Sequence, residues 1–284
     1  MSPRTKKFFR LQVGPSLTCS GSACPTLAEV KQNKTMFNIA TAPKPAAQGL
    51  SQDGLSLLSP GELTTSLDLP SPGWTRSWNS LTGSWNRLPP DAHLKDGGHY
   101  RKRRHSCFIQ ETADGALAQT PHRAHWQPKD YNALHGGFER WFDPVEPEVA
   151  QAAAWTDLLR AFGTLFNQVQ PVPRWFVEAH QFRIDTAGGV GRPTPEGAHR
   201  DGVNFVVVLL VARQSVKGGE TRVFDANGPH GVRFLMREPL TALLLDDARV
   251  IHETTPILPA DEDQRNGFRD TLVLTYRAAG FQAP

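Results

Sequence analysis

The feature that most constrains the fold of this chain is an unbroken apolar run, "FVVVLLVA", at residues 205–212. Such a run is typical of a strand that is covered on both faces, because a strand with one solvated face alternates apolar and polar residues. The run is far shorter than the roughly 20 apolar residues that a membrane-spanning helix needs. We therefore predict a buried central strand and no membrane span.

Four other segments have the pattern of strands. Two alternate apolar and polar residues, one follows a Gly-Gly turn and one is a second apolar run; they are residues 175–185, 269–277, 218–225 and 239–247. One amphipathic helix precedes them at residues 149–169, where apolar residues recur at steps of three and four before Pro171 and Pro173. A helix followed by five short strands predicts an antiparallel sandwich or barrel that carries helices on one side.

The N-terminal part has a different composition. Half of residues 41–90 are Pro, Gly, Ser or Thr, and their apolar residues come singly, which is typical of a linker. Trp74, Trp78 and Trp85 depart from this pattern, because tryptophan has a large surface that favours burial. We therefore predict a disordered or low-complexity extension over residues 1–73 and a folded domain over residues 74–284.

Charge and cysteine content narrow the class of protein. A net charge of +3 and a pI of about 8.8, without a dense stripe of Lys and Arg, predict no nucleic-acid partner. The three cysteines cannot all pair within one chain, which favours a reducing cytoplasm. The first residues, "MSPRTKKFFRLQVG", lack the apolar segment of a secretory signal.

Titratable residues stand directly before the central apolar run. His199 and Asp201 are two residues apart, so in an extended segment both side chains project to the same face. His252 follows the apolar segment 239–247. Two histidines and one carboxylate form a facial triad, which is typical of non-haem iron(II) and leaves coordination positions open, although zinc accepts the same ligands.

A basic residue favours the iron oxygenase over a zinc hydrolase. Arg269 begins the strand at 269–277, and Thr271 lies on the same face of that strand. A guanidinium can bind a carboxylate through two parallel hydrogen bonds, as a dicarboxylate cosubstrate would require. A zinc hydrolase would not need Arg269.

Taken together, the segments "HRDGVNFV", "GGETRVFD", "VIHETTPI" and "GFRDTLVLTYR", with "YRKRRHSCF" and "YNALHGGFERWF" upstream, resemble a known family. They are similar to the iron(II)- and 2-oxoglutarate-dependent dioxygenases, and more narrowly to the family that contains bacterial L-isoleucine 4-hydroxylase and similar hydroxylases of free amino acids. The resemblance covers about residues 74–284. It implies a mainly β fold with flanking helices around a double-stranded β-helix core, which is a cupin-like jelly roll.

The resemblance also implies a site and a reaction. His199, Asp201 and His252 would bind Fe(II), and Arg269, helped by Thr271, would bind the far carboxylate of 2-oxoglutarate. With O2 as the second cosubstrate, the enzyme would hydroxylate an unactivated carbon of a free amino acid or similar small metabolite and release succinate and CO2. The related halogenases lack the carboxylate ligand, so Asp201 favours hydroxylation.

Two alternatives to a dioxygenase stay open from the sequence. One is a non-catalytic jelly roll that binds a metal or ligand as a sensor or biofilm-related factor, and the other is the zinc hydrolase. The oligomeric state is not indicated.

Several further residues have a functional and a structural interpretation. Arg183, which alternates with Phe182 and Ile184, is a candidate for binding a substrate carboxylate. The basic run 101–105 could bind nucleic acid or a substrate carboxylate, but a short basic run is more typical of a solvated surface. The segment "YNALHGGFERWF" suits either a loop over a pocket or a plain turn. Gly218 and Gly219 are expected to be turn residues. The remaining single histidines are expected to be structural or exposed; they are His122, His125, His135, His180 and His230.

Overall fold

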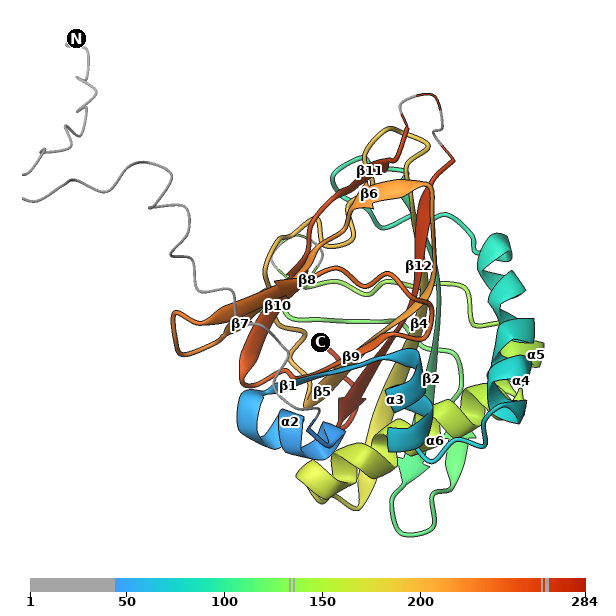
Figure 1. The fold of residues 1–284 in the computed structure, drawn as a ribbon, viewed down its shortest axis with the longest axis vertical. Helices are drawn as coiled ribbons and strands as arrows, with labels where there is room; N and C mark the ends of the chain where they lie inside the picture. Colours follow the sequence, from blue (N-terminus) through green and yellow to red (C-terminus); the bar gives the residue numbers. More distant parts are fainter. Residues whose placement is uncertain (1–43, 133, 135, 262, 264–265) are drawn as a thin grey trace, which may run out of the picture. The chain divides into compact units, whose positions relative to one another are not determined.

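The fold is built on one large antiparallel sheet. The computed structural model describes residues 44–284 except 133, 135, 262, 264 and 265. Seven strands form the main sheet in the order β1-β9-β5-β12-β4-β2-β3 (Figure 1). Their bounds are β1 Leu55–Leu58, β2 Arg101–Glu111, β3 Leu117–Gln119, β4 Arg174–Asp185, β5 Phe205–Gln214, β9 Ala242–Asp246 and β12 Phe268–Arg277.

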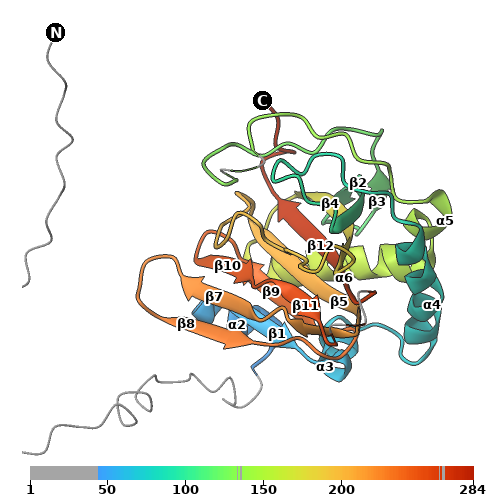
Figure 2. The same cartoon turned by 90° about the horizontal axis from the view of Figure 1, so that it is seen from above.

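Two small antiparallel sheets complete the β structure. One has the order β10-β7-β8, with β7 at Thr221–Asp225, β8 at Gly231–Phe234 and β10 at Val250–Thr254; the other pairs β6 (Val216–Gly218) with β11 (Ile257–Pro259). The three-stranded sheet lies opposite the main sheet in Figures 1 and 2. The predicted jelly-roll class, mainly β with flanking helices, is confirmed.

Strand β5 contributes to two separate cores, which explains its continuous apolar run. Val207 and Leu209 pack in the core on the helix side of the main sheet, whereas Val206 and Leu210 pack with Val223 of β7 between the sheets. Successive side chains of a strand point to opposite faces, so a strand covered on both faces needs apolar residues at every position. The prediction of a buried central strand is therefore correct.

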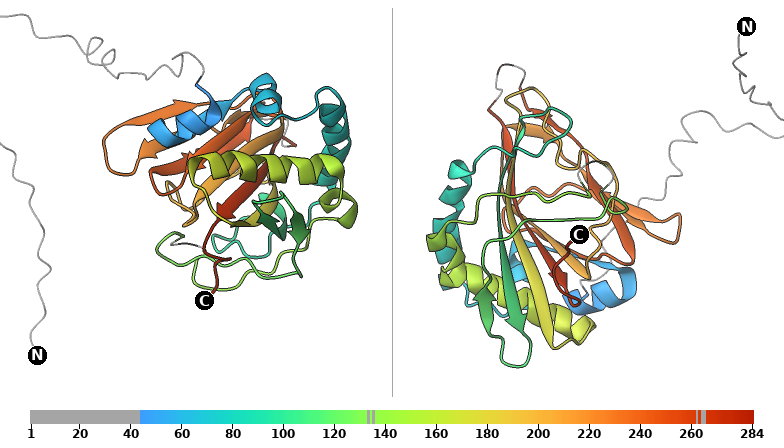
Figure 3. Two further views of the ribbon diagram at one scale, coloured as in Figure 1. Left: turned by 90° about the horizontal axis from the view of Figure 1, so that it is seen from below. Right: turned by 180° about the vertical axis from the view of Figure 1, so that it is seen from behind.

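Helix α6, Ala153–Val169, covers the outer face of the main sheet (Figure 3). Trp155, Phe162 and Phe166 are fully buried against this face, and the ring of Phe166 stacks on that of Phe205 at 4.4 Å between centroids. The predicted helix began at residue 149, but the structure divides that segment into α5 (Pro147–Ala150) and α6. No helix among the described residues is long and apolar enough to span a membrane.

The prediction of a linker before residue 74 was wrong for the part of it that the structure describes. Helix α2 (Ala46–Asp53), strand β1 and helix α3 (Pro60–Ser66) precede α4 (Gly73–Leu81) and the 3-10 helix η1 (Thr82–Arg87). Strand β1 pairs with β9 along its whole length, and Leu50 and Leu63 are fully buried. Each of these elements is too short to show a period and contributes only a few apolar residues to a core that β9 and α6 supply.

The boundary predicted at residues 73 and 74 therefore lies inside a folded unit that includes the described residues from 44 onward. The prediction that three tryptophans are buried is confirmed, since Trp74, Trp78 and Trp85 have at most 3% of their surface exposed. The predictions for residues 1–43, which include two of the three cysteines, lie outside the described residues.

The expectation that the basic run 101–105 forms a solvated surface was also wrong. These residues begin β2, an interior strand that pairs with β4 and β3. Arg101, Arg103 and His105 are buried, and Lys102 and Arg104 alternate with them on the other face. A strand whose inward positions carry charge has no apolar alternation, so its sequence does not resemble a strand.

Candidate active site

The two histidines singled out in the sequence are brought together by their own backbones. His199 donates its N–H to the carbonyl of His252 at 3.0 Å, and His252 donates to the carbonyl of His199 at 2.9 Å. The imidazole rings lie 4.6 Å apart between centroids. This pairing attaches the segment before β5 to the edge strand β10. It therefore brings His199 and His252 into contact although they are far apart in the sequence.

Asp201 completes the group from the same loop. Its Oδ1 lies 3.7 Å from Nε2 of His199 and its Oδ2 lies 3.7 Å from Nε2 of His252. Asp247 holds this loop in place, because its buried carboxylate accepts backbone N–H groups of Asp201, Gly202 and Val203 at 3.0, 2.7 and 3.1 Å. Arg200, between the two polar residues, points away and donates to the carbonyl of Ala248.

The ring nitrogens of these imidazoles are placed for metal binding. Nδ1 of His199 lies 2.9 Å from the carbonyl of Gly197, which can only accept, so Nδ1 carries a proton and Nε2 is the nitrogen that can bind a metal. Burial, together with the nearby His199, lowers the pKa of His252 to about 4, so this ring is neutral. Burial opposes the charge on His199, but the carboxylates of Asp201 and Glu196 raise the pKa of its imidazole, so a metal would have to displace the Nε2 proton there. Two imidazoles and one carboxylate within 4.8 Å of one another fit a divalent ion such as Fe(II).

Arg269 and Thr271 lie in the same cavity as these three residues, which we call the central cavity. Arg269 is 3% exposed, and its Nε and Nη2 have no hydrogen-bond partner among the described residues. Burial and the neighbouring Arg213 lower the pKa of Arg269 to about 10, which leaves the guanidinium charged. A buried cation with free N–H groups requires an anion, and a carboxylate fits its planar fork.

The backbone around Arg269 is shaped for a close approach. Gly218 and Gly219 have φ angles of 77° and 69°, as expected for turn residues. A Cβ atom at Gly219 would stand 2.8 Å from Ile257 and 2.9 Å from the guanidinium of Arg213. Glycine is therefore needed there both for its conformation and for space beside the arginine pair.

Arg183 does not lie with the other predicted residues. Its Nε and Nη2 donate to the two carboxylate oxygens of Asp270 at 2.7 and 2.6 Å, and it does not line the central cavity. Its neighbours Phe182 and Ile184 do line the cavity, so strand alternation directs Arg183 to the opposite face. The prediction that Arg183 binds substrate is contradicted by this geometry.

Three further arginines also line the central cavity, two of them from the basic run that the sequence favoured as a solvated surface. They are Arg101, Arg103 and Arg140, and each has one guanidinium nitrogen without a partner among the described residues. The guanidinium of Arg103 lies over the rings of Phe142 and Phe182 at 3.9 and 4.5 Å, which fixes its position. Asn132 lines the cavity as well, so two residues of the segment "YNALHGGFERWF", Asn132 and Arg140, contribute to a pocket.

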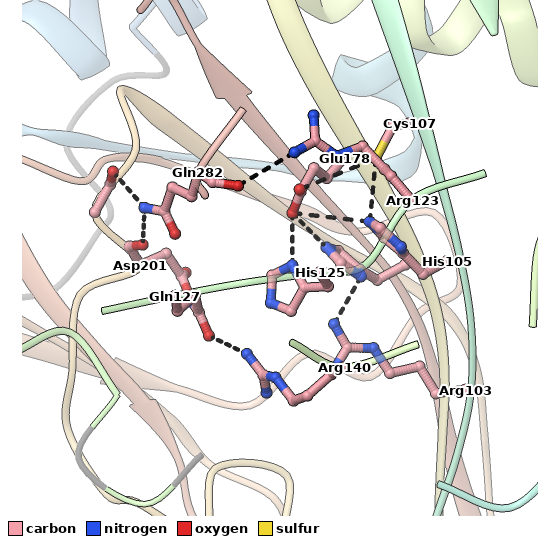
Figure 4. A network of polar contacts seen from close by, with 12 residues as sticks. Arg103, His105, Cys107, Arg123, His125, Gln127, Arg140, Glu178, Asp201 and Gln282 are labelled. Atoms are coloured by element: carbon pink, nitrogen blue, oxygen red, sulfur yellow. Dashed lines mark hydrogen bonds and ion pairs between the residues drawn. The ribbon is translucent and has the colours of Figure 1, made fainter. Parts of the chain in front are cut away.

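A second group of ligand-type residues lies beside these arginines. His105, His125, Glu178 and His180 are all buried, and their polar atoms lie within 4.8 Å of one another. Figure 4 shows the Glu178 carboxylate at the centre of these contacts, the shortest of which is 2.7 Å to Nδ1 of His125. We call this group the Glu178 cluster. His125 and His180, which were expected to be structural or exposed, are both buried and line the central cavity, and His135 lies outside the described residues.

Hydrogen-bond donors favour a proton network over a metal site in the Glu178 cluster. Nη2 of Arg103 lies 2.8 Å from Nδ1 of His180, and a guanidinium can only donate. His180 therefore carries its proton on Nε2, which faces Glu178 at 3.5 Å and so offers no lone pair to a metal. Burial opposes ionisation, but the hydrogen bond from His180 and the charge of Arg103 hold the pKa of Glu178 below its ordinary value.

The comparisons with known proteins agree with this architecture. A family model described as 2OG-Fe dioxygenase matches residues 82–275, so the chain belongs to this family of enzymes. The family uses Fe(II), 2-oxoglutarate and O2, which makes this chain an oxidoreductase. A search of curated proteins finds no significant match.

Solved structures include one similar in sequence and others similar in fold. A bsmA homolog from Methylobium petroleophilum PM1 is 56% identical, with a TM-score of 0.79, over 84% of this chain and 94% of that chain. IDO from Bacillus thuringiensis is 17% identical, with a TM-score of 0.68, over 86% and 99% of the two chains. The Fe(II)/α-ketoglutarate-dependent dioxygenase TqaL is 21% identical, with a TM-score of 0.62, over 81% and 85%. At such identities the last two support the fold alone.

Proposed function

We propose that His199, Asp201 and His252 bind the iron of this dioxygenase and that Arg269, assisted by Thr271, binds the far carboxylate of 2-oxoglutarate. The observation that carries this assignment is the buried guanidinium of Arg269, whose free N–H groups lie in the same cavity as the three ligand-type residues. A zinc hydrolase would have no use for a second, buried cation there. A non-catalytic ligand-binding protein would not need a metal-ligand set and an anion site in one cavity.

The bound iron and cosubstrate supply the oxidising power, since oxidative decarboxylation of 2-oxoglutarate to succinate and CO2 accompanies the transfer of one oxygen atom of O2 to the substrate. The chain contributes position and shielding. Arg269 fixes the cosubstrate at one end, and the three ligands occupy only part of the coordination sphere. Val203, Val208 and Val273 line the cavity and limit water near the reacting carbon.

The finer part of the proposal is the substrate, a free amino acid, as in the isoleucine 4-hydroxylase family that the sequence resembles. Arg269 accounts for one anion, but Arg103 and Arg140 form a second cationic group in the same cavity. We assign this second group to the carboxylate of the substrate. Ionised Glu178, which also lines the cavity, is suited to the substrate ammonium.

The proposal excludes peptides and blocked amino acids, because both charges of the head group must be present. It also prefers hydroxylation to halogenation, since Asp201 occupies the position that halide would need. The cytoplasmic location inferred from the cysteines belongs to the same proposal; Cys107, the cysteine among the described residues, is buried and free.

The test is a mass-spectrometric screen of free amino acids with anaerobically iron-loaded protein, 2-oxoglutarate and O2. We expect one or more products heavier by one oxygen, formed together with succinate. For each substrate found, the N-acetyl derivative and the methyl ester are the matched controls and should not be hydroxylated. Iron-loaded protein that turns over blocked substrates equally well would reject the head-group assignment, and protein that binds no 2-oxoglutarate would reject the proposal altogether.

A further inference from the structure

Gln127 joins the proposed substrate end of the cavity to the proposed iron ligand. Its side chain is 6% exposed and lines the central cavity. Its Nε2 donates to Oδ1 of Asp201 at 3.1 Å. Gln127 is therefore a neutral donor placed against one specific oxygen of the carboxylate.

The direction of the Gln127 amide is fixed by its other end. Oε1 accepts from Nη2 of Arg140 at 2.8 Å and from Nδ2 of Asn132 at 3.3 Å. Both partners can only donate through these nitrogens, so Oε1 must face them and Nε2 must face Asp201. A flipped amide would place a donor against the Arg140 cation and a lone pair against the Asp201 carboxylate.

This arrangement constrains how Asp201 can bind a metal. Because Oδ1 is engaged by Gln127, Oδ2 is the oxygen left to act as a ligand. A carboxylate that chelated through both oxygens would occupy a coordination position that 2-oxoglutarate or O2 requires. We infer that Gln127 is a positioning residue that keeps Asp201 a one-oxygen ligand and so keeps that position open; this inference rests on the ligand set proposed above.

The same geometry connects the substrate to the iron. Arg140, which orients Gln127, is one of the arginines assigned to the substrate carboxylate, and its Nε has no partner among the described residues. A substrate anion bound by Arg140 would hold the guanidinium in place and, through Gln127, the carboxylate of Asp201. Loss of Gln127 should therefore disturb metal and cosubstrate binding even though the residue contacts neither.

The inference is tested with two variants. Gln127→Met keeps the length of the side chain but has no donor, whereas Gln127→His retains a ring N–H that can donate to Asp201. Fe(II) affinity is measured anaerobically by calorimetry without cosubstrate, and 2-oxoglutarate affinity is measured at saturating Fe(II). We expect Gln127→Met to weaken Fe(II) binding about 10- to 100-fold, the usual effect of losing a partner of a metal ligand, and to weaken 2-oxoglutarate binding at saturating iron. Gln127→His should recover part of both.

The matched control is Gln168→Met on the exposed face of α6, which should bind both ligands as the wild type does. Wild-type affinities for both ligands in Gln127→Met would overturn the inference. It would also be overturned if both variants lost the same affinity and both metal-free variants had a lower melting temperature, because the loss would then reflect a destabilised fold. If the wild-type protein itself binds no Fe(II), the proposed ligand set of His199, Asp201 and His252 is wrong. That result differs from a result in which the wild type binds Fe(II) and Gln127→Met binds it equally well.

Discussion

Nη2 of Arg103 lies 2.8 Å from Nδ1 of His180, and this contact decides where the protons of the Glu178 cluster reside. A guanidinium cannot accept, so His180 is protonated on Nε2 and donates toward Glu178. The cluster resembles a metal site in composition, but its donors converge on one buried carboxylate. It thereby keeps a negative charge among three arginines, as recognition of a substrate ammonium would require.

The buried imidazoles of this cluster should make the protein sensitive to acid. Burial holds the pKa values of His105, His125 and His180 well below the ordinary value, so the folded state keeps them neutral. The unfolded chain binds protons at these positions below about pH 6.5. The free energy of unfolding should therefore be fully retained above that pH and fall as the pH drops, by about 1.4 kcal/mol for each histidine at pH 5.5.

Urea unfolding of metal-free protein at pH 7.5 and 5.5 measures this loss. His105→Gln removes one of the titrating groups and should reduce the difference between the two pH values, whereas His99→Gln, at an exposed position, is the control. An equal pH dependence in wild type and His105→Gln would contradict the prediction.

Removal of Arg269 should weaken cosubstrate binding more than it affects folding. A hydrogen bond to a charged group contributes about 1.5–3 kcal/mol, so Arg269→Ala should raise the dissociation constant of 2-oxoglutarate about 10- to 100-fold. Anaerobic titration of the iron-loaded protein measures it. Arg174→Ala, at an exposed position of β4, is the control and should leave this dissociation constant unchanged. An unchanged dissociation constant in Arg269→Ala would show that Arg269 does not bind 2-oxoglutarate.

Metal binding should depend on both paired histidines. His199→Ala and His252→Ala each delete an imidazole but keep the backbone pair that joins the two segments. We expect folded protein with strongly reduced Fe(II) affinity and no turnover. Metal analysis after anaerobic loading, alongside circular dichroism, checks this, and full iron occupancy in either variant would show that the residue is not a ligand.

Arg183 should prove structural. Asp270, at 2% exposed, would become a buried unpaired carboxylate in Arg183→Ala, so the free energy of unfolding should fall by about 3–5 kcal/mol. The Michaelis constant of the folded enzyme for its substrate should stay the same, because Arg183 does not line the cavity. Adding Asp270→Asn to Arg183→Ala should recover part of the stability. A raised Michaelis constant in Arg183→Ala with unchanged stability would instead show that Arg183 binds the substrate.

The segment before residue 74 should contribute to global stability. Leu50→Ala and Leu63→Ala each remove a fully buried side chain and should lower the free energy of unfolding by about 2–5 kcal/mol. Leu258→Ala, at a position that is 39% exposed, is the control and should have a much smaller effect. Chemical denaturation distinguishes this from a linker, in which neither Leu50→Ala nor Leu63→Ala would lower the free energy of unfolding.

Elements that bury a continuous apolar face are the ones whose sequences predict their structure. Local periodicity identified α6 and β5 because both bury a continuous apolar face. It missed β2, whose inward residues are Arg101, Arg103 and His105, and it missed α2 and β1, which are short. These elements owe their stability to partners distant in the chain, so their own sequences hold little trace of their structure.

The sequence by itself determined the chemistry available: two histidines and a carboxylate beside an apolar strand, and an arginine and a threonine on one face of another. Only the tertiary structure decided which charged groups share a cavity. Alternation on β4 directs Arg183 to the far face and Glu178 to the near one. Pairing of β2 with β4 brings Arg101, Arg103, His105 and His180 toward that carboxylate, and the bridge between His125 and Arg140 adds one more histidine and arginine. The reason is physical: a strand's period is set locally, but the side of the sheet that becomes the cavity is set by how the sheets pack.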